Sequence, residues 1–436
     1  MADAGRVSSG QAGGGGVSGG GVSGFRPGTA APQRIVRVRR QYNQWVANQT
    51  LEDYALRFTA KSARRWSPWR VANTALGSIS FLALEAIGGA ITLAYGFDNA
   101  VAAILTVSVL IFLTGLPIAA SAAKWGVDID LLTRGAGFGY IGSTITSLIY
   151  ASFTFIFFAI EAAILAMALQ DLFGVPFWIG TIASSIAIIP IVTHGITLIN
   201  RVQNLTQPVW IVLQLLPFIA LALADPGIFS RWQGFAGTAT GGGSGMSTGG
   251  FDLMAFGAAS GVLFALVGQI GEQVDFLRFL PRRRGRRDLR WWAAMTAAGP
   301  GWIIPGALKL LGGSLLAVLA LEAGVPVAHA DEPTRMYLVA FGQMVGTDQA
   351  ALALGLTGVF VLLAQVKINV TNAYAGSIAW SNFFSRLTHS HPGRVVWLIF
   401  NVAIAVLLMS FGIYEGLEHI LGLYSTVAIA WVGAIT

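Results

Sequence analysis

Six ionisable side chains lie inside segments that are otherwise apolar and long enough to cross a membrane. A charge at the centre of a bilayer costs at least ~2.5–3.5 kcal/mol on insertion scales, so such groups usually face a protein interior or a watery cavity, where they pair, bind a solute or move protons. We therefore expect this chain to handle a polar solute inside a membrane. The six residues are Glu85, Glu161, Glu272, Asp275, Lys309 and Lys367.

The composition also indicates a membrane location. Of the 436 residues, 55% are hydrophobic and 11% are charged, and the mean hydropathy is +0.67. Soluble domains average about 25% charged residues, so the sequence predicts an all-α polytopic membrane protein with the lipid bilayer as a partner. The net charge of +7 is concentrated near the N-terminus and in short loops, which is typical of cytoplasmic loops rather than of nucleic-acid binding. The absence of Cys excludes disulfides and Cys-ligated metals.

Three regions differ in composition. Residues 1–33 are rich in Gly and are expected to form a disordered tail. Residues 34–70 mix basic and aromatic side chains, which predicts a cytoplasmic juxtamembrane segment; specific binding of anionic lipid is the alternative. Residues 71–436 contain the apolar segments and form the predicted transmembrane core.

About ten helices are expected in that core. Loops rich in Arg and Lys alternate with loops rich in acids, so the basic loops and the N-terminus are predicted to be cytoplasmic in a multi-pass protein of the cell membrane. The predicted helices span roughly 71–95, 98–120, 138–170, 176–196, 206–224, 251–280, 291–321, 351–382, 395–414 and 417–436.

Two of these helices contain glycine and polar residues in their middle. The first has Gly77 and Ser80, and the sixth has Gly268 and Gly271 around Gln269. Such residues weaken the helical hydrogen-bond ladder and let the backbone open toward a cavity. Interrupted segments at corresponding positions of two halves indicate an inverted-repeat transporter with a midplane site. Close packing of small residues between helices is the alternative.

Several stretches resemble the nucleobase–cation symporter family one, which includes the cytosine/purine permeases and the hydantoin, allantoin and uracil transporters. Residues 126–143, GVDIDLLTRGAGFGYIGS, resemble the family signature before the third helix. Residues 275–279, DFLRF, resemble the motif that closes the sixth helix, and residues 369–382, ending in WSN, resemble the eighth. LG at 76–77 and GG at 88–89 resemble the first helix.

The resemblance implies a LeuT-like core of two inverted five-helix repeats, with helices 1 and 6 broken and the solute between helices 1, 3, 6 and 8. The family normally has twelve spans, whereas this sequence stops at Thr436, inside the predicted tenth helix. We therefore expect the chain to be truncated at its C-terminus, with a shortened last helix.

The resemblance also implies substrate-binding positions on the third and sixth helices. Phe157 takes the place of a Trp that stacks on the ligand ring, and Glu161, one turn later on the same face, takes the place of a ligand-binding Gln. The second stacking aromatic of the family falls at Leu266, which weakens the case for a planar nucleobase. Gln269 offers a donor and an acceptor. A packing role for Phe157 and a structural role for Glu161 are the alternatives.

On the eighth helix, Asn369 matches a ligand-contacting Asn of the family, and Asn372 follows one turn later. The alternative for this pair is hydrogen bonding between helices. Glu85, just past the first break, and Glu272 lie on a candidate proton path.

In the family, a sodium site is formed by backbone carbonyls near Gly77–Phe81, including Ser80, and by two hydroxyls of the eighth helix. Those two positions are Lys367 and Ile368 here, and neither can ligate sodium. An ammonium at this place could act as a built-in cation that loads and unloads a proton. Protons are therefore favoured over sodium as the coupling cation; a structural Lys367 is the alternative.

The sequence thus predicts a secondary active transporter for a small polar heterocyclic solute, nucleobase-like (purine, pyrimidine, hydantoin or related), working by alternating access. The alternative is a transporter-like membrane sensor whose signalling domain is absent from this chain. No phosphate-binding loop, zinc pattern or nucleophile elbow is present, so neither an enzyme nor a cofactor is expected.

Overall fold

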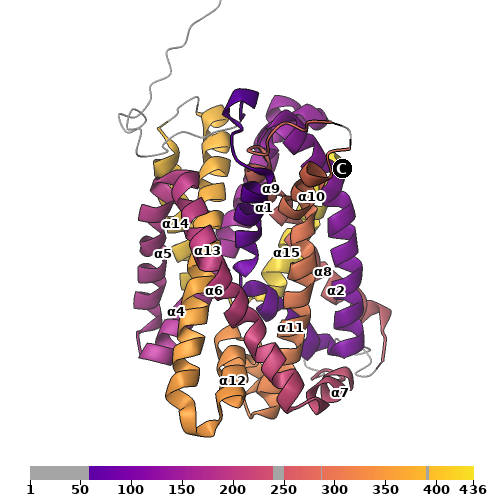
Figure 1. Ribbon diagram of the computed structural model, residues 1–436, viewed down its shortest axis with the longest axis vertical. Helices are drawn as coiled ribbons and strands as arrows, with labels where there is room; N and C mark the ends of the chain where they lie inside the picture. Colours follow the sequence, from indigo (N-terminus) through magenta and orange to yellow (C-terminus); the bar gives the residue numbers. More distant parts are fainter. Residues whose placement is uncertain (1–57, 239–249, 286, 389–391) are drawn as a thin grey trace, which may run out of the picture. The chain divides into compact units, whose positions relative to one another are not determined.

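The computed structural model describes residues 58–238, 250–285, 287–388 and 392–436. The Gly-rich tail at 1–33 and the segment 34–57 lie outside the described residues. Within the described ranges the chain is helical, without strands, and has one isolated β-bridge between Phe58 and Val127. Figure 1 shows the long helices running roughly parallel to one another.

The first predicted helix is broken at the expected place. Ser67 caps α1 (Pro68–Leu76) by accepting from the Arg70 amide, and α1 passes into a 3₁₀ turn, η3 (Gly77–Ser80). Phe81 is extended (φ −63°, ψ 131°), and α2 (Ala83–Trp125) then begins. The break therefore exposes the amide groups at the start of α2 to a neighbouring side chain.

Gly96 divides α2 at the predicted boundary between the first two spans. Its φ is positive (78°) and its ψ is 169°, a backbone conformation that strongly favours glycine. The Gly88–Gly89 pair is not part of the break: a Cβ on Gly88 would collide with the Leu310 carbonyl of α11, and one on Gly313 of α11 would collide with the Glu85 backbone. The packing interpretation therefore holds for Gly88, since it lets α2 and α11 approach closely.

The sixth predicted helix is tightened rather than unwound. It consists of α8 (Leu253–Leu263), a 3₁₀ segment η5 (Phe264–Gly268) and α9 (Gln269–Leu277). Gly268 keeps right-handed helical angles (φ −61°, ψ −21°). The second break is therefore a local change of helical pitch, without an extended residue like Phe81.

The remaining described helices follow in chain order. They are η2 (Lys61–Ala63), α3 (Ile129–Thr133), the π-helical turn η4 (Arg134–Phe138), α4 (Gly139–Phe173), α5 (Phe177–Thr193), α6 (Gly195–Ala224), α7 (Gly227–Gln233), α10 (Leu289–Ala298), η6 (Pro300–Trp302), α11 (Ile303–Glu322), η7 (Val327–His329), α12 (Pro333–Val345), η8 (Thr347–Gln349), α13 (Ala350–Leu387), α14 (Arg394–Ser410) and α15 (Leu417–Ile435).

The predicted helix over 291–321 is wrong in one respect. Gly299 (φ −94°, ψ −117°) and the turn at Pro300 separate α10 from α11, because Pro cannot donate to the ladder and disfavours helix in the residue before it. The short helices α7 and α12 were not predicted. In the described parts of the chain, seven helical segments are long and apolar enough to span a membrane, and α5 and α14 are shorter apolar helices. With α2 divided at Gly96, each of the ten predicted segments is mainly helical.

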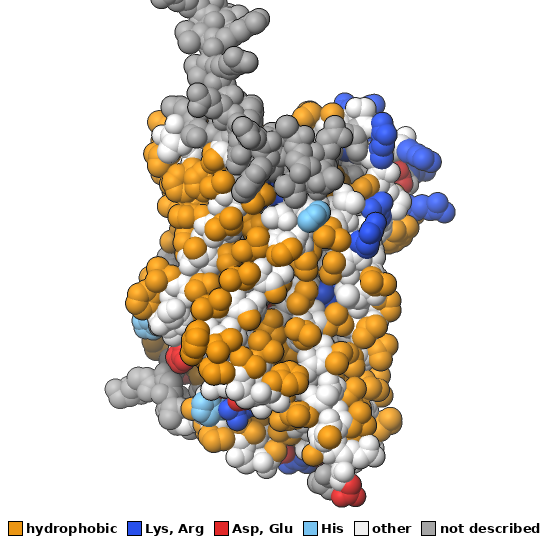
Figure 2. Space-filling view, turned by 90° about the vertical axis from the view of Figure 1, so that its left-hand side faces the viewer, with side chains coloured by type: hydrophobic (Ala, Val, Ile, Leu, Met, Phe, Trp, Pro, Cys, Tyr) orange, Lys and Arg blue, Asp and Glu red, His pale blue; other side chains and the backbone are white. Residues whose placement is uncertain are grey.

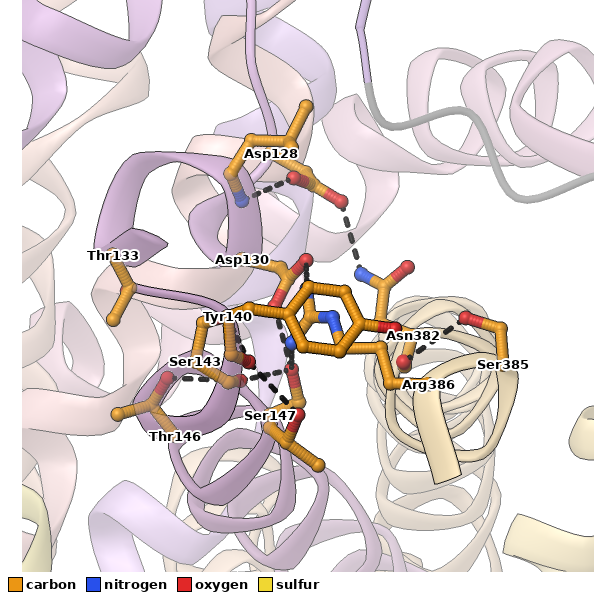
Figure 3. Close-up of polar contacts among 12 residues, drawn as sticks. Asp128, Asp130, Thr133, Tyr140, Ser143, Thr146, Ser147, Asn382, Ser385 and Arg386 are labelled. Atoms are coloured by element: carbon orange, nitrogen blue, oxygen red, sulfur yellow. Dashed lines mark hydrogen bonds and ion pairs between the residues drawn. The ribbon is translucent and has the colours of Figure 1, made fainter. Parts of the chain in front are cut away.

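Two pairs of long helices organise the packing: α2 lies along α11, and α4 lies along α13. At one end of the second pair, Asp130 forms a buried ion pair with Arg386 and accepts from the Ser147 hydroxyl at 2.7 Å (Figure 3). Beside it, Asp128 caps α3 and accepts from the Asn382 amide at 3.0 Å. These contacts fix the start of α4 against the end of α13, and so fix the faces that carry Glu161 and Asn369.

Candidate functional site

The break in the first helix is filled by the carboxylate of Glu161. Its two oxygens accept from the backbone amides of Leu82 and Ala83 at 3.2 and 3.1 Å. Glu161 is fully buried on α4. The carboxylate thus caps the N-terminus of α2, where free amides and the helix dipole favour a negative charge. A solute that reaches this carboxylate must donate hydrogen bonds to it, because a carboxylate only accepts.

An aromatic wall lies next to Glu161. Phe157, one turn earlier on α4, meets Phe81 of the break edge to face at 6.2 Å between ring centroids and Phe153 at 4.6 Å. Phe81 also contacts Trp302 at 6.3 Å. Leu266 is buried in η5 and adds no ring. The structure therefore provides one aromatic wall at the break, and its two central rings already pack against each other.

The eighth predicted helix, α13, presents buried amides that lack hydrogen-bond partners among the described residues. Asn369 and Asn372 are at most 1% exposed, and the oxygen and nitrogen of both amides have no hydrogen-bond partner in the described part of the chain. Gln365, one turn earlier, lies beside Glu161, and the spacing of four and three residues puts all three amides on one helix face. A buried amide without a partner costs about 1–3 kcal/mol per group, so this face is suited to a polar ligand or water.

The second break supplies further polar groups. Gln269 donates to the Glu272 carboxylate, whose other oxygen has no partner among the described residues. Gln273 donates to the Ser78 hydroxyl at 3.0 Å, and so joins α9 to η3. Ser80 in turn donates to the Ala364 carbonyl of α13 at 3.1 Å. The two breaks and the polar helix α13 are thus directly connected.

Lys367 lies on another face of α13, toward α6. Its ammonium donates to the side-chain oxygens of Gln203, Gln207 (2.9 Å) and Thr206 (3.3 Å), and contacts the Gln203 carbonyl at 3.5 Å. No acid pairs with it among the residues described. These oxygens come from α6, whereas the sequence suggested carbonyls at 77–81. The two places adjoin, because a Cβ on Gly77 would collide with the Gln203 side chain.

Glu85 forms a buried ion pair with Lys309 of α11 at 2.6 Å. Gln214 of α6 bonds both partners, at 3.1 Å to Glu85 and 2.9 Å from Lys309, and Tyr337 of α12 donates to Glu85 at 3.0 Å. Breaking such a pair on one side costs about 3–5 kcal/mol. The network therefore fixes α12, a helix the sequence analysis missed, to the interior of the core.

Asp275 and Arg278, near the end of α9, form a further buried ion pair at 3.4 Å. Tyr150 of α4 donates to Asp275 at 3.0 Å, and Arg278 donates to Tyr374 of α13 at 3.3 Å. These contacts join α9 to both α4 and α13.

Acids and ion pairs cluster near α7 and α12, at the opposite end of the core from the Arg-rich loop between α9 and α10 (Figure 1). Arg231 of α7 bonds Asp225 at 2.6 Å and Glu322 at 2.8 Å, and its hydrogen bond lowers the pKa of Asp225. Between α11 and α12, burial raises the pKa of Asp331 to about 7, with Glu332 adding to the shift. A cleft of about 450 Å³ near this end is lined by Tyr95, Glu418 and His419 among others.

Most of the sequence-predicted site residues are buried and lie on elements that contact one another: Phe157, Glu161, Gly77, Ser80 and Phe81 at the first break, Leu266, Gln269 and Glu272 at the second, and Asn369 and Asn372 on α13. Lys367 and Glu85 lie in separate networks with α6 and α11. Sequence reasoning missed Gln365, although its spacing from Asn369 was a usable signal. It also missed Gln203, Gln207 and Gln214, whose only signal was that they are polar in an apolar helix. No group of three or more His, Asp or Glu that could hold a metal ion occurs in the described residues.

The fold is that of the LeuT-like membrane transporters, and the chain is an integral multi-pass membrane protein. In structure it is similar to Mhp1, a nucleobase-cation-symport-1 family transporter in a closed conformation with bromovinylhydantoin bound, with a TM-score of 0.60 and 17% identity over 88% of this chain and 78% of Mhp1. It is also similar to a Na⁺-coupled sialic acid symporter (TM-score 0.58, 14% identity, 89% and 81% coverage) and to the Eremococcus coleocola manganese transporter (TM-score 0.54, 13%, 87% and 80%). No protein-family model and no curated protein matches the sequence. The family resemblance predicted from the motifs is thus confirmed at the level of the fold.

Proposed function

We propose that the chain is a secondary active transporter that moves a small polar solute by alternating access. The observation that carries this proposal is the pair of buried amides on α13. Asn369 and Asn372 present four polar atoms without a partner among the described residues, on a helix that packs against both interrupted helices. Burying such polar atoms in an apolar core without partners costs free energy. A solute bound at the midplane between broken helices would supply the missing hydrogen bonds.

The balance of buried charge favours a donor-rich or cationic solute. Glu85 and Asp275 are each paired with a basic side chain. Glu161 and Glu272 accept hydrogen bonds only from uncharged groups, and Lys367 donates only to uncharged groups, among the described contacts. If all three are ionised, this region carries one excess negative charge. A proton or a positively charged solute would neutralise it, and burial of an unbalanced charge is costly.

A heterocycle fits the single aromatic wall. Phe157 and Phe81 pack edge to face, so a planar ring would add to an existing aromatic wall, and Glu161 with the α13 amides would supply acceptors and donors around it. Leu266 leaves the opposite side without stacking, so neutral cytosine or uracil should bind weakly. Nucleobase-like purines, pyrimidines or hydantoins with a donor-rich or cationic edge should bind better.

Protons are favoured over sodium as the coupling cation. The oxygens around Lys367 are already occupied by an ammonium, which supplies a positive charge without an external ion. If this group releases and regains a proton during the cycle, substrate affinity will depend on pH and not on sodium. The distribution of Arg and Lys among the loops supports a cytoplasmic N-terminus and a location in the plasma or inner membrane.

A thermal-shift screen on the purified protein tests the site. Cationic and donor-rich heterocycles should raise the melting temperature more than uracil or cytosine, equally in choline and in sodium. Asn369→Leu should abolish this ligand shift while leaving the ligand-free melting temperature unchanged or higher, because it removes unpartnered polar atoms.

Asn401→Leu is the matched control. The Asn401 oxygen accepts from Trp380 at 3.0 Å, so its loss should lower the melting temperature. If Asn369→Leu is destabilised as much as Asn401→Leu and retains the ligand shift, Asn369 holds helices together and the proposed site is wrong. A solute that binds but is never transported would instead favour a membrane sensor.

A further inference from the structure

A basic cleft lies where the first described residues meet the ends of two helices. It has a volume of about 660 Å³, and its walls come from the segment 58–64, the last turns of α2, the loop at 282–283 and the first turn of α10. Figure 2 shows Lys and Arg side chains gathered at one end of the molecule, beyond a middle covered by hydrophobic side chains. The cleft belongs to the end that carries the basic loops.

The lining of the cleft is strongly cationic. Five basic side chains line it and none of the lining residues is acidic. None of the five makes an ion pair with a described acid. Like charges repel when they are held together, so a bound anion would stabilise this arrangement. The five are Lys61, Arg64, Lys124, Arg282 and Arg283.

Arg64 gives the cleft a fixed element. It is 7% exposed, its Nε donates to the Thr59 carbonyl at 3.0 Å and one terminal nitrogen donates to the Ala123 carbonyl at 2.9 Å. Its other terminal nitrogen is buried without a partner among the described residues. Arg64 therefore holds the 58–64 segment on the end of α2 and keeps one donor unused.

Aromatic side chains place the cleft at the level of lipid headgroups. Trp125 ends the α2 span and is 60% exposed, and Phe58 is 54% exposed. Lys124 lies 4.8 Å from the Trp125 ring, and Arg283 lies 5.4 Å from the Trp292 ring. Exposed aromatic residues at the ends of spans typically sit at the membrane interface. Basic residues beside them meet lipid phosphates and carry the positive charge that anionic lipids attract.

We propose that this cleft binds the phosphate group of an anionic phospholipid. Lys124, Arg64 and Arg283 contact the phosphate from α2, the 58–64 segment and the loop before α10, and the aromatic rings contact the lipid next to it. A bound lipid would join three elements of the core that are far apart in sequence. This proposal is independent of the transported solute.

The test is thermal stability of the full chain in neutral detergent with added phosphatidylglycerol, phosphatidylcholine or inorganic phosphate. Phosphatidylglycerol should raise the melting temperature saturably, and the other two should not. Each basic residue near an anionic surface contributes about five-fold in affinity, so Lys124→Gln with Arg283→Gln should weaken the lipid effect roughly 30-fold. Both residues are exposed, so the variant should fold, which its lipid-free melting curve checks.

The control variant is Arg134→Gln with Arg201→Gln, which removes the same charge from exposed positions of η4 and α6 outside the cleft. It should keep the lipid effect. Equal weakening in both variants would mean general surface attraction and would overturn the proposal, as would no effect of phosphatidylglycerol on the wild-type chain. A saturable effect of inorganic phosphate that is lost in the cleft variant would assign the cleft to a soluble phosphate and overturn the lipid assignment.

Discussion

Replacing Lys367 by Ala should convert a sodium-insensitive protein into one that sodium stabilises. The ammonium has three hydrogens, and its three side-chain partners are Gln203, Thr206 and Gln207 of α6. Truncation to Ala removes the cation and leaves these oxygens, with the Gln203 carbonyl, around a small space. Hard cations bind such clusters of oxygen ligands.

The expected loss of folding stability in Lys367→Ala follows from the contacts of the ammonium. Hydrogen bonds to a charged group contribute about 1.5–3 kcal/mol each, but the buried ammonium also loses hydration, so the net loss in choline medium should be on the order of 2 kcal/mol. A vacated site that binds sodium with a Kd of about 10 mM would recover about 1.4 kcal/mol at 100 mM sodium. Melting curves in matched choline and sodium chloride measure both effects.

Lys309→Ala is the matched control, because it removes another buried membrane Lys. It leaves the Glu85 carboxylate without its ion-pair partner and should lose about 3–5 kcal/mol, since breaking a buried pair strands a charge. In this variant the oxygens of Gln203, Thr206 and Gln207 remain occupied by Lys367, so it measures the loss of a paired lysine without vacating those oxygens. Sodium stabilisation of the wild-type chain, or a Lys367→Ala variant that keeps the pH dependence of substrate binding, would refute the role given to Lys367.

Three further results are expected. Glu161→Gln should lower the affinity for cationic heterocycles about ten-fold or more and leave the affinity for uracil low, since the amide lacks the charge that caps α2. Tight uracil binding that survives the change would show the substrate inference wrong. Asp331→Asn should raise stability above pH 7 and not below pH 4. Burial raises the Asp331 pKa to about 7 from 3.8, so the stability of the wild type falls by at most roughly 4 kcal/mol as pH rises through that range. Melting curves of Asp348→Asn, which changes an exposed acid, are the control, and the same behaviour in both variants would contradict this prediction. In a double-mutant cycle by chemical unfolding, Asp130→Asn and Arg386→Met should each cost about 3 kcal/mol, and the double variant less than their sum, because the pair is buried; additive losses would mean that the two side chains are not coupled.

The sequence predicted the helical segments well because apolar length decides them. It could not locate the interruption at Gly299–Trp302, since the hydropathy of 291–321 is the same whether or not the backbone bends. The amphipathic helix α12 was missed although Glu332 and Pro333 form a typical helix start. Its apolar side packs on the core through Tyr337 and Phe341, a contact that local pattern does not reveal.

At the site, the sequence revealed which positions are polar but not which residues they contact. Glu85 and Lys309 were both singled out, yet their pairing joins residues 224 positions apart and depends on the close approach of Gly88 and Gly313. Glu161 was predicted to face a ligand, and its bonds to the start of α2 depend on the extended backbone at Phe81. Partners of this kind are set by tertiary packing, which one sequence does not specify.

The most direct test of the central claim is uptake of the best-binding heterocycle into proteoliposomes, measured in choline medium with an imposed pH gradient. Wild-type protein should accumulate the solute against its concentration gradient, with no increase on adding sodium. Asn369→Leu, reconstituted to the same level and with an unchanged melting temperature, should not. Binding without uptake by the wild type, or undiminished uptake by Asn369→Leu, would contradict the account.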